Sequence, residues 1–366
     1  MRVHQFVSYL HAPGDAVADQ VYAFREAFHS WGWESQVFAL EGERHVPIEW
    51  QPVQRCSEDR LTCADDILLY HYAGGSALTR LLQEIPGRPV IYYHNITPHE
   101  YVESFHQELA STLRSGREEL LTLRHAPSLA ASEYSRRELL ELGFEQVHVV
   151  PLVLQLERLH TSAQTAAGQA LIGRYSDGWV NWITVGRIAP NKCCEDVIRS
   201  FAYYQKFINR RARLFLIGGY RHFEAYQFNL ARLTEKWGVE EVHWCGWTSF
   251  EDGFGAYYRL GTVLVSMSEH EGFCLPLVEA LSFDIPVLAY SAAAVPDTLG
   301  DAGILMRHKS YEVIAELVQL LHDDHSMRSR LLEGQRERLK QFDPALTLER
   351  LREALLSCEW NQHGTY

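Results

Sequence analysis

Apolar segments with the length of β-strands alternate with amphipathic segments along nearly the whole chain of 366 residues. The expected strands include residues 35–40, 67–72, 89–94, 147–150, 179–185, 214–217, 242–245, 263–266 and 286–289. Apolar side chains recur every three or four residues over 17–31, which predicts a helix that ends at Gly32. Strands that alternate with helices form parallel sheets covered on both faces. The sequence therefore predicts an α/β fold.

Chain length and local composition indicate two domains. At roughly 100 to 200 residues per domain, 366 residues exceed what one ordinary core needs. Regular periodicity fades between residues 151 and 177, and a new series of strands follows. We expect one domain at 1–165, a second at 166–342, and a terminal helix and tail at 343–366 that packs back toward the first. Ser135 and Glu138 are also expected to form a capping box at a helix start.

Charge and cysteine content narrow the possible partners and the compartment. The formal net charge is −13, which disfavours a nucleic-acid-binding surface and a broad polybasic membrane face. Seven cysteines without a C-x-x-C pair suit reduced thiols better than a disulfide framework or a zinc site. No apolar run approaches the roughly 18 residues that span a membrane. We expect a cytoplasmic protein with at most peripheral contact at the inner face of the membrane.

Two glutamates eight residues apart flank a predicted helix start in the second half of the chain. The segment EHEGFCLPLVEA runs from Glu269 through Glu271 to Glu279 and Ala280. Pro276 is suited to the first turn of a helix. The backbone N–H groups of 272–275 would then face an anion at the positive end of the helix. This arrangement suits a sugar diphosphate, although a merely capped helix is the structural alternative.

A second segment places two cations after a predicted strand. Residues 183–185 lead into Gly186 and Arg187, and Lys192 follows five residues later at a predicted helix start. Guanidinium and ammonium groups both bind phosphate oxygens. We therefore expect Arg187 and Lys192 to contact the same diphosphate.

These two segments together resemble glycosyltransferase family four, which combines G-R-x-x-P-x-K with a later E-x7-E. The resemblance implies the GT-B architecture, in which two Rossmann-like domains face each other across a cleft. It implies that Glu271 binds the transferred sugar, that Glu279 binds the ribose, and that Arg187 and Lys192 bind the diphosphate. It also implies backbone contacts to the substrate from Gly272, Phe273, Cys274 and Leu275, with Cys274 at a position where glycine is usual.

Further site residues follow from the same resemblance. His94, at the end of the strand 89–94, stands where the family places a histidine beside the donor sugar. Gly14 follows the first strand, in the loop near the diphosphate and acceptor, although the usual second glycine is missing. Gly219, with Gly218 before it, matches a turn beside the nucleotide. Histidines and glycines at strand ends are also common as structural residues, so a structural role is the alternative for each.

The predicted chemistry is hexose transfer from a nucleotide diphosphate sugar to a carbohydrate or lipid-linked glycan acceptor. Negative charge develops on the leaving diphosphate, and Arg187, Lys192 and the helix start would stabilise it. The sequence contains no Asp-x-Asp triplet, so we expect no metal and no cofactor. Retention of the anomeric configuration is implied by the resemblance alone. Similarity of YHNITPHEY to bacterial mannosyl- and rhamnosyltransferases of surface polysaccharide assembly favours GDP-mannose, and UDP sugars are the alternative donors.

Two other functions are compatible with the sequence. A nucleotide-sugar 2-epimerase would share the two-domain architecture and the diphosphate site, and it would form product without an acceptor. A non-catalytic GT-B protein would bind the nucleotide sugar without turnover. The combination of G-R-x-x-P-x-K and E-x7-E favours the transferase.

Overall fold

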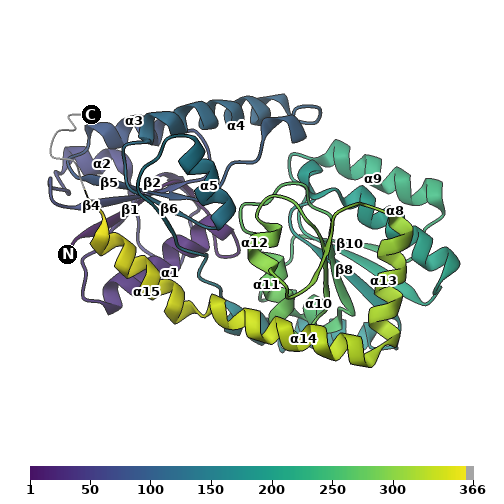
Figure 1. The fold of residues 1–366 in the computed structure, drawn as a ribbon. Coiled ribbons are helices and arrows are strands. Elements are labelled where there is room, and N and C mark those ends of the chain that lie inside the picture. Colours follow the sequence, from purple (N-terminus) through teal and green to yellow (C-terminus); the bar gives the residue numbers. More distant parts are fainter. Residues whose placement is uncertain (360–366) are drawn as a thin grey trace. The chain divides into compact units, whose positions relative to one another are not determined.

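The computed structural model describes residues 1–359, and the end of the expected tail, 360–366, lies outside the described residues. The chain divides into two compact units. The first comprises residues 1–99, 108–153 and the chain from Asp343 onward; the second comprises residues 100–107 and 154–342. Figure 1 shows the ribbon of each unit.

The first unit is built on a parallel sheet of seven strands in the order β3-β2-β1-β4-β5-β6-β7. The strands are β1 Val3–Leu10, β2 Val37–Gly42, β3 Gln51–Pro52, β4 Ile67–Tyr72, β5 Arg88–Tyr93, β6 Ser128–Ala130 and β7 Val147–Val149. The helices are α1 Ala16–Ser30, α2 Val53–Glu58, α3 Ala77–Glu84, α4 Gln107–Leu120, α5 Glu133–Glu141 and α15 Pro344–Ser357, with short 3-10 turns at His99–Tyr101 and Leu121–Leu123.

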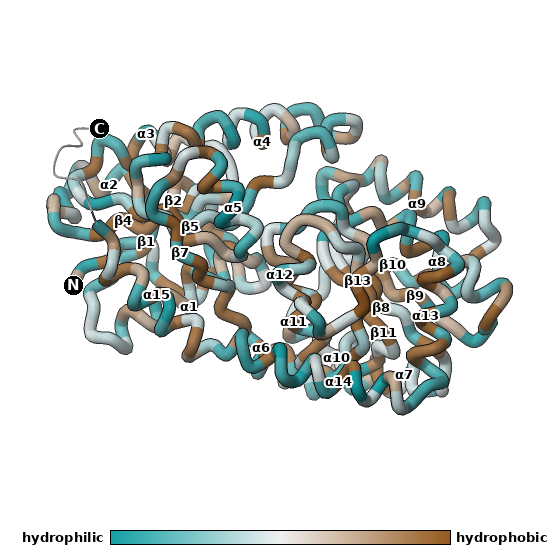
Figure 2. The backbone as a smooth tube through the Cα atoms, in the orientation of Figure 1, coloured by the Kyte–Doolittle hydropathy of each residue, from teal (hydrophilic) through white to brown (hydrophobic). Residues whose placement is uncertain are grey.

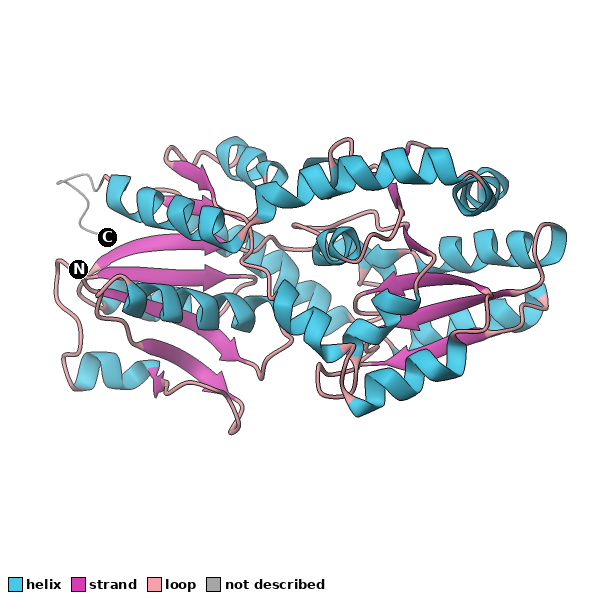
Figure 3. Cartoon of the chain, turned by 90° about the horizontal axis from the view of Figure 1, so that it is seen from below, coloured by secondary structure: helices cyan, strands magenta, loops and turns pink. Residues whose placement is uncertain are grey.

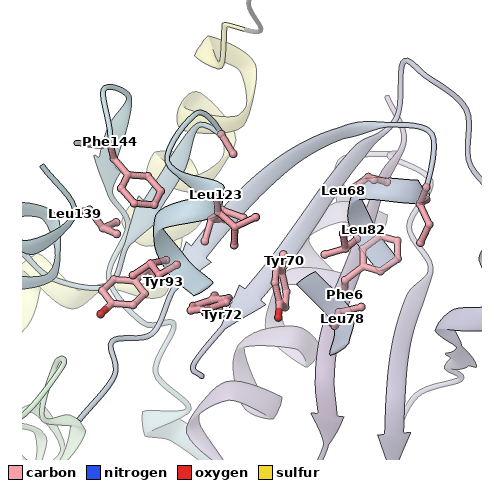
Figure 4. Packing of buried hydrophobic residues seen from close by; sticks show 14 of the residues in the cluster. Phe6, Leu68, Tyr70, Tyr72, Leu78, Leu82, Tyr93, Leu123, Leu139 and Phe144 are labelled. Carbon is pink, nitrogen blue, oxygen red and sulfur yellow. The ribbon is translucent and has the colours of Figure 1, made fainter. Parts of the chain in front are cut away.

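Alternating side chains along β4 contribute to the two faces of this sheet. Leu68, Tyr70 and Tyr72 belong to the large hydrophobic cluster on one face, together with Leu78 and Leu82 of α3 (Figure 4). Successive side chains of a strand point to opposite faces, so His71 belongs to the other face. There it packs against Phe24 of α1, with ring centroids 5.7 Å apart. The pleat therefore separates an apolar layer from a layer that contains a buried histidine.

The helix start predicted at Ser135 is wrong. Ser132 is the N-cap of α5, and its side chain accepts a hydrogen bond from the backbone N–H of Ser135. Glu138 instead accepts hydrogen bonds from Tyr93 at 2.8 Å and Asn95 at 2.9 Å. The pattern S-x-x-E begins at Ser135, which lies three residues after the true N-cap. Glu138 bonds to residues distant in sequence instead of to the backbone at the helix start.

The second unit has a parallel sheet of six strands in the order β10-β9-β8-β11-β12-β13. The strands are β8 Val180–Val185, β9 Ala212–Ile217, β10 Val242–Gly246, β11 Val263–Ser266, β12 Val287–Tyr290 and β13 Ile304–Met306. The helices are α6 Leu156–Ser162, α7 Ala166–Tyr175, α8 Cys194–Phe207, α9 Glu224–Trp237, α10 Phe254–Leu260, α11 Leu275–Ser282, α12 Val295–Leu299, α13 Tyr311–Asp323 and α14 His325–Leu339, with 3-10 turns at Pro190–Lys192 and Lys340–Phe342.

Hydrophobic stretches follow the strands within each unit (Figure 2), and helices flank both sheets (Figure 3). The predicted α/β class with two parallel, Rossmann-like sheets is confirmed. Among the helices within residues 1–359, none combines the length and the apolar character needed to cross a bilayer.

The division between the units falls after Val153, not after residue 165. Close packing of α6 on α10 explains this position. A Cβ atom added to Gly255 would lie 2.1 Å from the carbonyl oxygen of Leu159, so the two helix backbones are in contact. Most of the stretch 151–177, where periodicity fades, thus belongs to the second unit and contains its helices α6 and α7.

Candidate functional site

The first site loop of the second unit follows β8. Gly186 directly after this strand has φ +130°, a conformation that side chains other than hydrogen disfavour. The chain then passes Arg187 and forms a 3-10 turn at Pro190–Lys192, before α8 begins at Cys194. Lys192 folds back toward the strand end, with its Nζ 3.5 Å from where a Cβ of Gly186 would be. The predicted Gly-Arg turn therefore brings the lysine to the carboxyl edge of the sheet.

The second loop follows β11 and leads into α11. Cys274 is the N-cap of α11 and has φ +71°, yet its side chain does not cap the helix. Left-handed backbone is costly for residues other than glycine, which explains why glycine would suit this position. Pro276 lies in the first turn, as expected. The helix start thus directs its positive end toward the loop 271–274 without a side-chain cap from Cys274.

The structure joins these two loops through an ion pair. Lys192 Nζ lies 2.6 Å from Oε1 and 2.8 Å from Oε2 of Glu271. The side chains are 19% and 9% exposed, so water screens the pair only partly. Burial lowers the pKa of Lys192, but the Glu271 carboxylate raises it, and the net result is a pKa above the ordinary value. Lys192 is therefore a full cation in this site.

Asn191 fixes the two loops to each other, and sequence analysis missed this residue. Its backbone carbonyl accepts a hydrogen bond from the N–H of Glu269 at 2.9 Å. Its buried side chain donates to the carbonyl of His270 at 3.0 Å. Asn191 stands at a variable position of the motif, so the pattern offered no signal for it.

Glu279 lies one turn into α11 and accepts a hydrogen bond from the Tyr258 hydroxyl at 2.5 Å. Burial and then the nearby Glu279 carboxylate raise the pKa of Tyr258 well above its ordinary value, so the phenol stays protonated and donates. Tyr258 belongs to α10, and its sequence neighbourhood contained no motif that could have indicated this contact. The carboxylate predicted to bind ribose is therefore oriented by a buried phenol.

Arg187 and the Gly218–Gly219 turn are neighbours. The guanidinium of Arg187 lies over the ring of Phe223, 5.4 Å from its centroid. The backbone N–H of Ile188 donates to the carbonyl of Gly219 at 2.9 Å. A Cβ at Gly218 would lie 2.0 Å from the carbonyl oxygen of Gly186, so these two backbones touch. The end of β9 thus supports the loop that carries Arg187.

Two further residues hold the loops from outside, and neither was predicted. Lys309 binds Glu269 at 2.8 Å and Asp196 of α8 at 2.9 Å. Thr298 of α12 donates a short hydrogen bond to the carbonyl of Phe273. The scarcity of lysine in the chain could have drawn attention to Lys309, but it did not indicate which residues Lys309 contacts.

Gly14, in the first unit, occupies the loop after β1. Its φ of +107° favours glycine, because a residue with a side chain would be strained in this conformation. Its N–H donates to Asp19 at 3.1 Å. Asp15, the next residue, caps α1 by accepting from the N–H groups of Val17 and Ala18, both at 3.0 Å. The first N–H groups of α1 are therefore already bonded to a carboxylate.

His94 follows β5 in the first unit. Its Nε2 lies 3.1 Å from Nδ1 of His71, which is buried in the sheet. Burial lowers the pKa of His94 to about 3, so the imidazole is neutral at pH 7. The partner His71 was not predicted, because nothing in the strand pattern distinguishes a buried histidine from an apolar residue.

The predicted residues thus lie in two groups. The second unit brings together Arg187, Lys192, Glu271, Gly272, Phe273, Cys274, Leu275, Glu279 and Gly219 around the carboxyl ends of β8, β9 and β11. Gly14 and His94 lie at the corresponding edge of the first unit. In parallel α/β sheets, ligands bind at this edge.

Comparison with known proteins finds a family match within the second unit. Residues 181–338 match the family described as glycosyl transferases group 1. A relative named O-antigen chain mannosyltransferase B, from Escherichia coli, is 26% identical over 201 residues, which cover 54% of this chain and 51% of the relative. The chain therefore aligns with about half the length of that curated protein.

Solved structures resemble the whole chain. Anabaena HepE in complex with UDP and glucose has a TM-score of 0.76 at 16% identity, covering 97% of this chain and 99% of that one. Sucrose-phosphate synthase from Thermosynechococcus elongatus has a TM-score of 0.74 at 17% identity, covering 98% and 100%. WaaG, a glycosyltransferase involved in lipopolysaccharide biosynthesis, has a TM-score of 0.71 at 15% identity, covering 96% and 99%. The predicted architecture is confirmed: the chain has the GT-B fold, and its residues 181–338 match the model of glycosyl transferases group 1, as the sequence resemblance led us to expect.

Proposed function

We propose that the chain is a retaining glycosyltransferase that moves a hexose from a nucleotide diphosphate sugar to a glycan or lipid-linked glycan acceptor, without a metal. One observation carries the proposal: Lys192 and Glu271 meet within 2.6 Å beside the start of α11. A cation, a carboxylate and the positive end of a helix are thereby concentrated at one sheet edge. The first and last suit a leaving diphosphate, and the carboxylate suits sugar hydroxyls.

In the proposed reaction, the bond between the anomeric carbon and the phosphate oxygen breaks as the acceptor hydroxyl forms the new glycosidic bond. Negative charge then builds on the leaving diphosphate. Lys192 and Arg187 stabilise this charge, together with the N–H groups at the start of α11. The proton of the acceptor hydroxyl passes toward the departing phosphate, with the acceptor on the face that the nucleotide leaves.

We propose GDP-mannose as the donor, on the strength of the mannosyltransferase relative. UDP-glucose is the competing donor, because HepE was solved with UDP and glucose. Purified protein should be assayed with a panel of nucleotide sugars, with and without acceptor extracts, by measuring release of the nucleoside diphosphate. Turnover with GDP-mannose but not with UDP-glucose supports the proposed donor, and the reverse contradicts it.

The metal-free and retaining mechanism needs its own test. Transfer should continue in excess EDTA, since protein cations neutralise the diphosphate. Loss of most activity in EDTA, with recovery on adding magnesium or manganese, would contradict this proposal. NMR of the product should show the same anomeric configuration as the donor sugar.

Two alternatives give different products. A 2-epimerase would convert the nucleotide sugar in the absence of any acceptor, and a non-catalytic protein would bind it without turnover.

We further propose that the protein acts in the cytoplasm in polysaccharide biosynthesis, with at most peripheral membrane contact. The free thiols of the described cysteines support a reducing compartment. Cell fractionation, with a salt wash of the membrane fraction, tests this location.

A further inference from the structure

Three polar side chains form a continuous chain inside the first unit. Gln5 lies on β1, His71 on the adjacent β4, and His94 directly after β5. Gln5 Oε1 lies 2.9 Å from Nε2 of His71, and His71 Nδ1 lies 3.1 Å from Nε2 of His94. Gln5 and His71 are 0% and 2% exposed, whereas His94 is half-buried. The chain therefore runs from the core to a residue at the sheet edge.

A backbone carbonyl fixes the direction of the first link. Gln5 Nε2 donates to the carbonyl oxygen of Val21 at 3.1 Å. A carbonyl oxygen only accepts, so the amide NH2 must face Val21 and the amide oxygen must face His71. The amide oxygen also only accepts. The proton of this link must therefore be on Nε2 of His71.

Charge then decides the second link. Burial holds the pKa of His71 well below its ordinary value, and burial lowers the pKa of His94 to about 3. Both rings are neutral at pH 7, and a neutral imidazole has one N–H and one acceptor nitrogen. With its proton on Nε2, His71 accepts at Nδ1. His94 must donate from Nε2, which leaves its Nδ1 without a proton.

Aromatic packing holds the two rings in place. The rings of His71 and His94 are stacked, with centroids 5.4 Å apart and an interplanar angle of 24°. Tyr92 packs edge-on against His94 at 4.6 Å, and its own hydroxyl donates to the carbonyl of Val150 at 2.9 Å. His94 is therefore restrained on two sides, and rotation of its ring would break the link to His71.

We propose that Gln5 and His71 are positioning residues that hold His94 as the neutral Nε2–H tautomer, so that its Nδ1 accepts a hydrogen bond from a substrate hydroxyl. The assignment of that hydroxyl to the donor sugar rests on the proposed function. The tautomer itself does not. In this arrangement His94 cannot supply a proton through Nδ1, so it selects for a ligand that offers an O–H at this point.

The tautomer is measured directly by NMR of protein labelled with nitrogen-15 at histidine. The signals of His71 and His94 are assigned from the variants His71→Phe and His94→Phe. We expect both residues to be protonated at Nε2 and unprotonated at Nδ1 at pH 7. A proton on Nδ1 of His94 in the parent protein would overturn the proposal.

Substitution of Gln5 separates the hydrogen-bond acceptor from the bulk of the side chain. Gln5→Glu keeps an oxygen facing His71, and its buried carboxyl is expected to be protonated and to donate to the Val21 carbonyl, so His94 should keep its tautomer. Gln5→Met has similar bulk and no acceptor, so His94 should show a mixture of tautomers. Gln20→Met is the matched control, because Gln20 is also buried in the first unit and its side chain exchanges two hydrogen bonds with the backbone of Val153. An unchanged His94 tautomer in Gln5→Met contradicts the relay.

Kinetics test the link to substrate. The donor is GDP-mannose or UDP-glucose, whichever the parent protein turns over. It is compared with monodeoxy forms of the same nucleotide sugar. One deoxy form should lose about tenfold in kcat/KM with the parent protein, the size expected for one hydrogen bond, and lose no more than about twofold with His94→Phe. Gln5→Met should lower transfer about tenfold without changing nucleoside diphosphate binding, and Gln5→Glu should restore it.

The two sets of measurements fail separately. If His94 has the expected tautomer but no deoxy form distinguishes His94→Phe from the parent, the role of His94 in the proposed transferase site is wrong. If the deoxy effect is present but the tautomer of His94 is reversed, the contact between His94 and the donor sugar stands, and the relay from Gln5 is wrong.

Discussion

Lys192 and Glu271 form a two-point ion pair, with Nζ 2.6 Å and 2.8 Å from the two carboxylate oxygens. The proposed diphosphate cation and the proposed sugar-binding carboxylate are therefore partners of each other. Each compensates the charge of the other in a site that is mostly closed to water. We expect a nucleotide diphosphate sugar, which carries its own negative charge, to compete with Glu271 for Lys192, so that binding of the diphosphate would free the carboxylate for the sugar.

Glu271→Gln and Glu279→Gln should have opposite effects. Glu271→Gln should lower transfer about a hundredfold while nucleoside diphosphate binding changes by less than about threefold, because Lys192 is released toward the phosphate. Glu279→Gln should weaken nucleotide binding more than it lowers turnover, because Glu279 is proposed to hold ribose. Calorimetric binding and steady-state kinetics measure both. Equal loss of binding with intact turnover would refute the assignment of the two glutamates.

Lys192→Ala should lower kcat by about a hundredfold to a thousandfold, the usual effect of removing one donor from a developing oxyanion. It also leaves Glu271 buried without its cation, which should cost roughly 3 kcal/mol of unfolding free energy. Lys192→Ala combined with Glu271→Gln should recover most of that stability and none of the activity. Lys340→Ala, at an exposed pair with Glu337, is the control for loss of a lysine. Near-parental turnover in Lys192→Ala would exclude the proposed diphosphate contact.

Arg187→Lys should recover only part of the transfer activity that Arg187→Ala loses. Lysine keeps the charge, but it lacks the planar guanidinium that could hold two phosphate oxygens and that lies over Phe223. The ratio of kcat/KM between the two variants measures the contribution of geometry as distinct from charge. If both variants stay within about threefold of the parent, the loop after β8 only connects a strand to a helix.

Gly218 and Gly219 should respond differently to the same substitution. Gly218→Ala would place a Cβ 2.0 Å from the carbonyl of Gly186, at φ +150°, so the Arg187 loop must move. We expect a loss of at least about 2 kcal/mol in unfolding free energy and weaker nucleotide binding. At Gly219 the nearest described atom to the added Cβ would be the Cβ of Trp247 at 3.6 Å, an ordinary contact. Urea unfolding of both variants checks this contrast, which fails if Gly219→Ala is the more damaging change.

Stability should fall as the pH falls below 6.5. Burial depresses the pKa of His71 and His94 in the folded protein, so the unfolded chain binds more protons in this range. The stabilisation is present above the unfolded pKa of about 6.5 and is lost progressively toward acid. His94 should cost roughly 2 kcal/mol between pH 7 and pH 5, and His71 should add to the loss in the same direction. His4 and His160, whose pKa values burial also lowers, add to the slope.

Comparison with His71→Phe isolates one contribution. Urea unfolding of the variant between pH 5 and pH 7 should show a shallower dependence on pH than the parent, by about one proton. An identical slope would mean that His71 is not neutral in the folded protein.

Local sequence predicted the α/β class and the residues after β8 and β11, because their chemistry is written in consecutive positions. Gly186 and Arg187 are consecutive residues after a strand end. Glu271 and Glu279 have a fixed spacing across a helix start. Apolar periodicity likewise depends only on near neighbours, so α1 and the central strands could be read from it. The unit boundary and the start of α5 could not, because long-range packing of α6 and the distant partners of Glu138 decide them.

By itself the sequence determined the alternation of strands and helices and the two motifs. Only the tertiary structure decided which side chains meet. Lys192 and Glu271 are 79 residues apart, and Gln5 and His71 are 66 apart. These contacts arise because parallel strands order themselves by long crossovers, so β1 lies beside β4 and β8 beside β11. Local periodicity encodes each strand but not its neighbour in the sheet, and the neighbour determines the pairings on which the site depends.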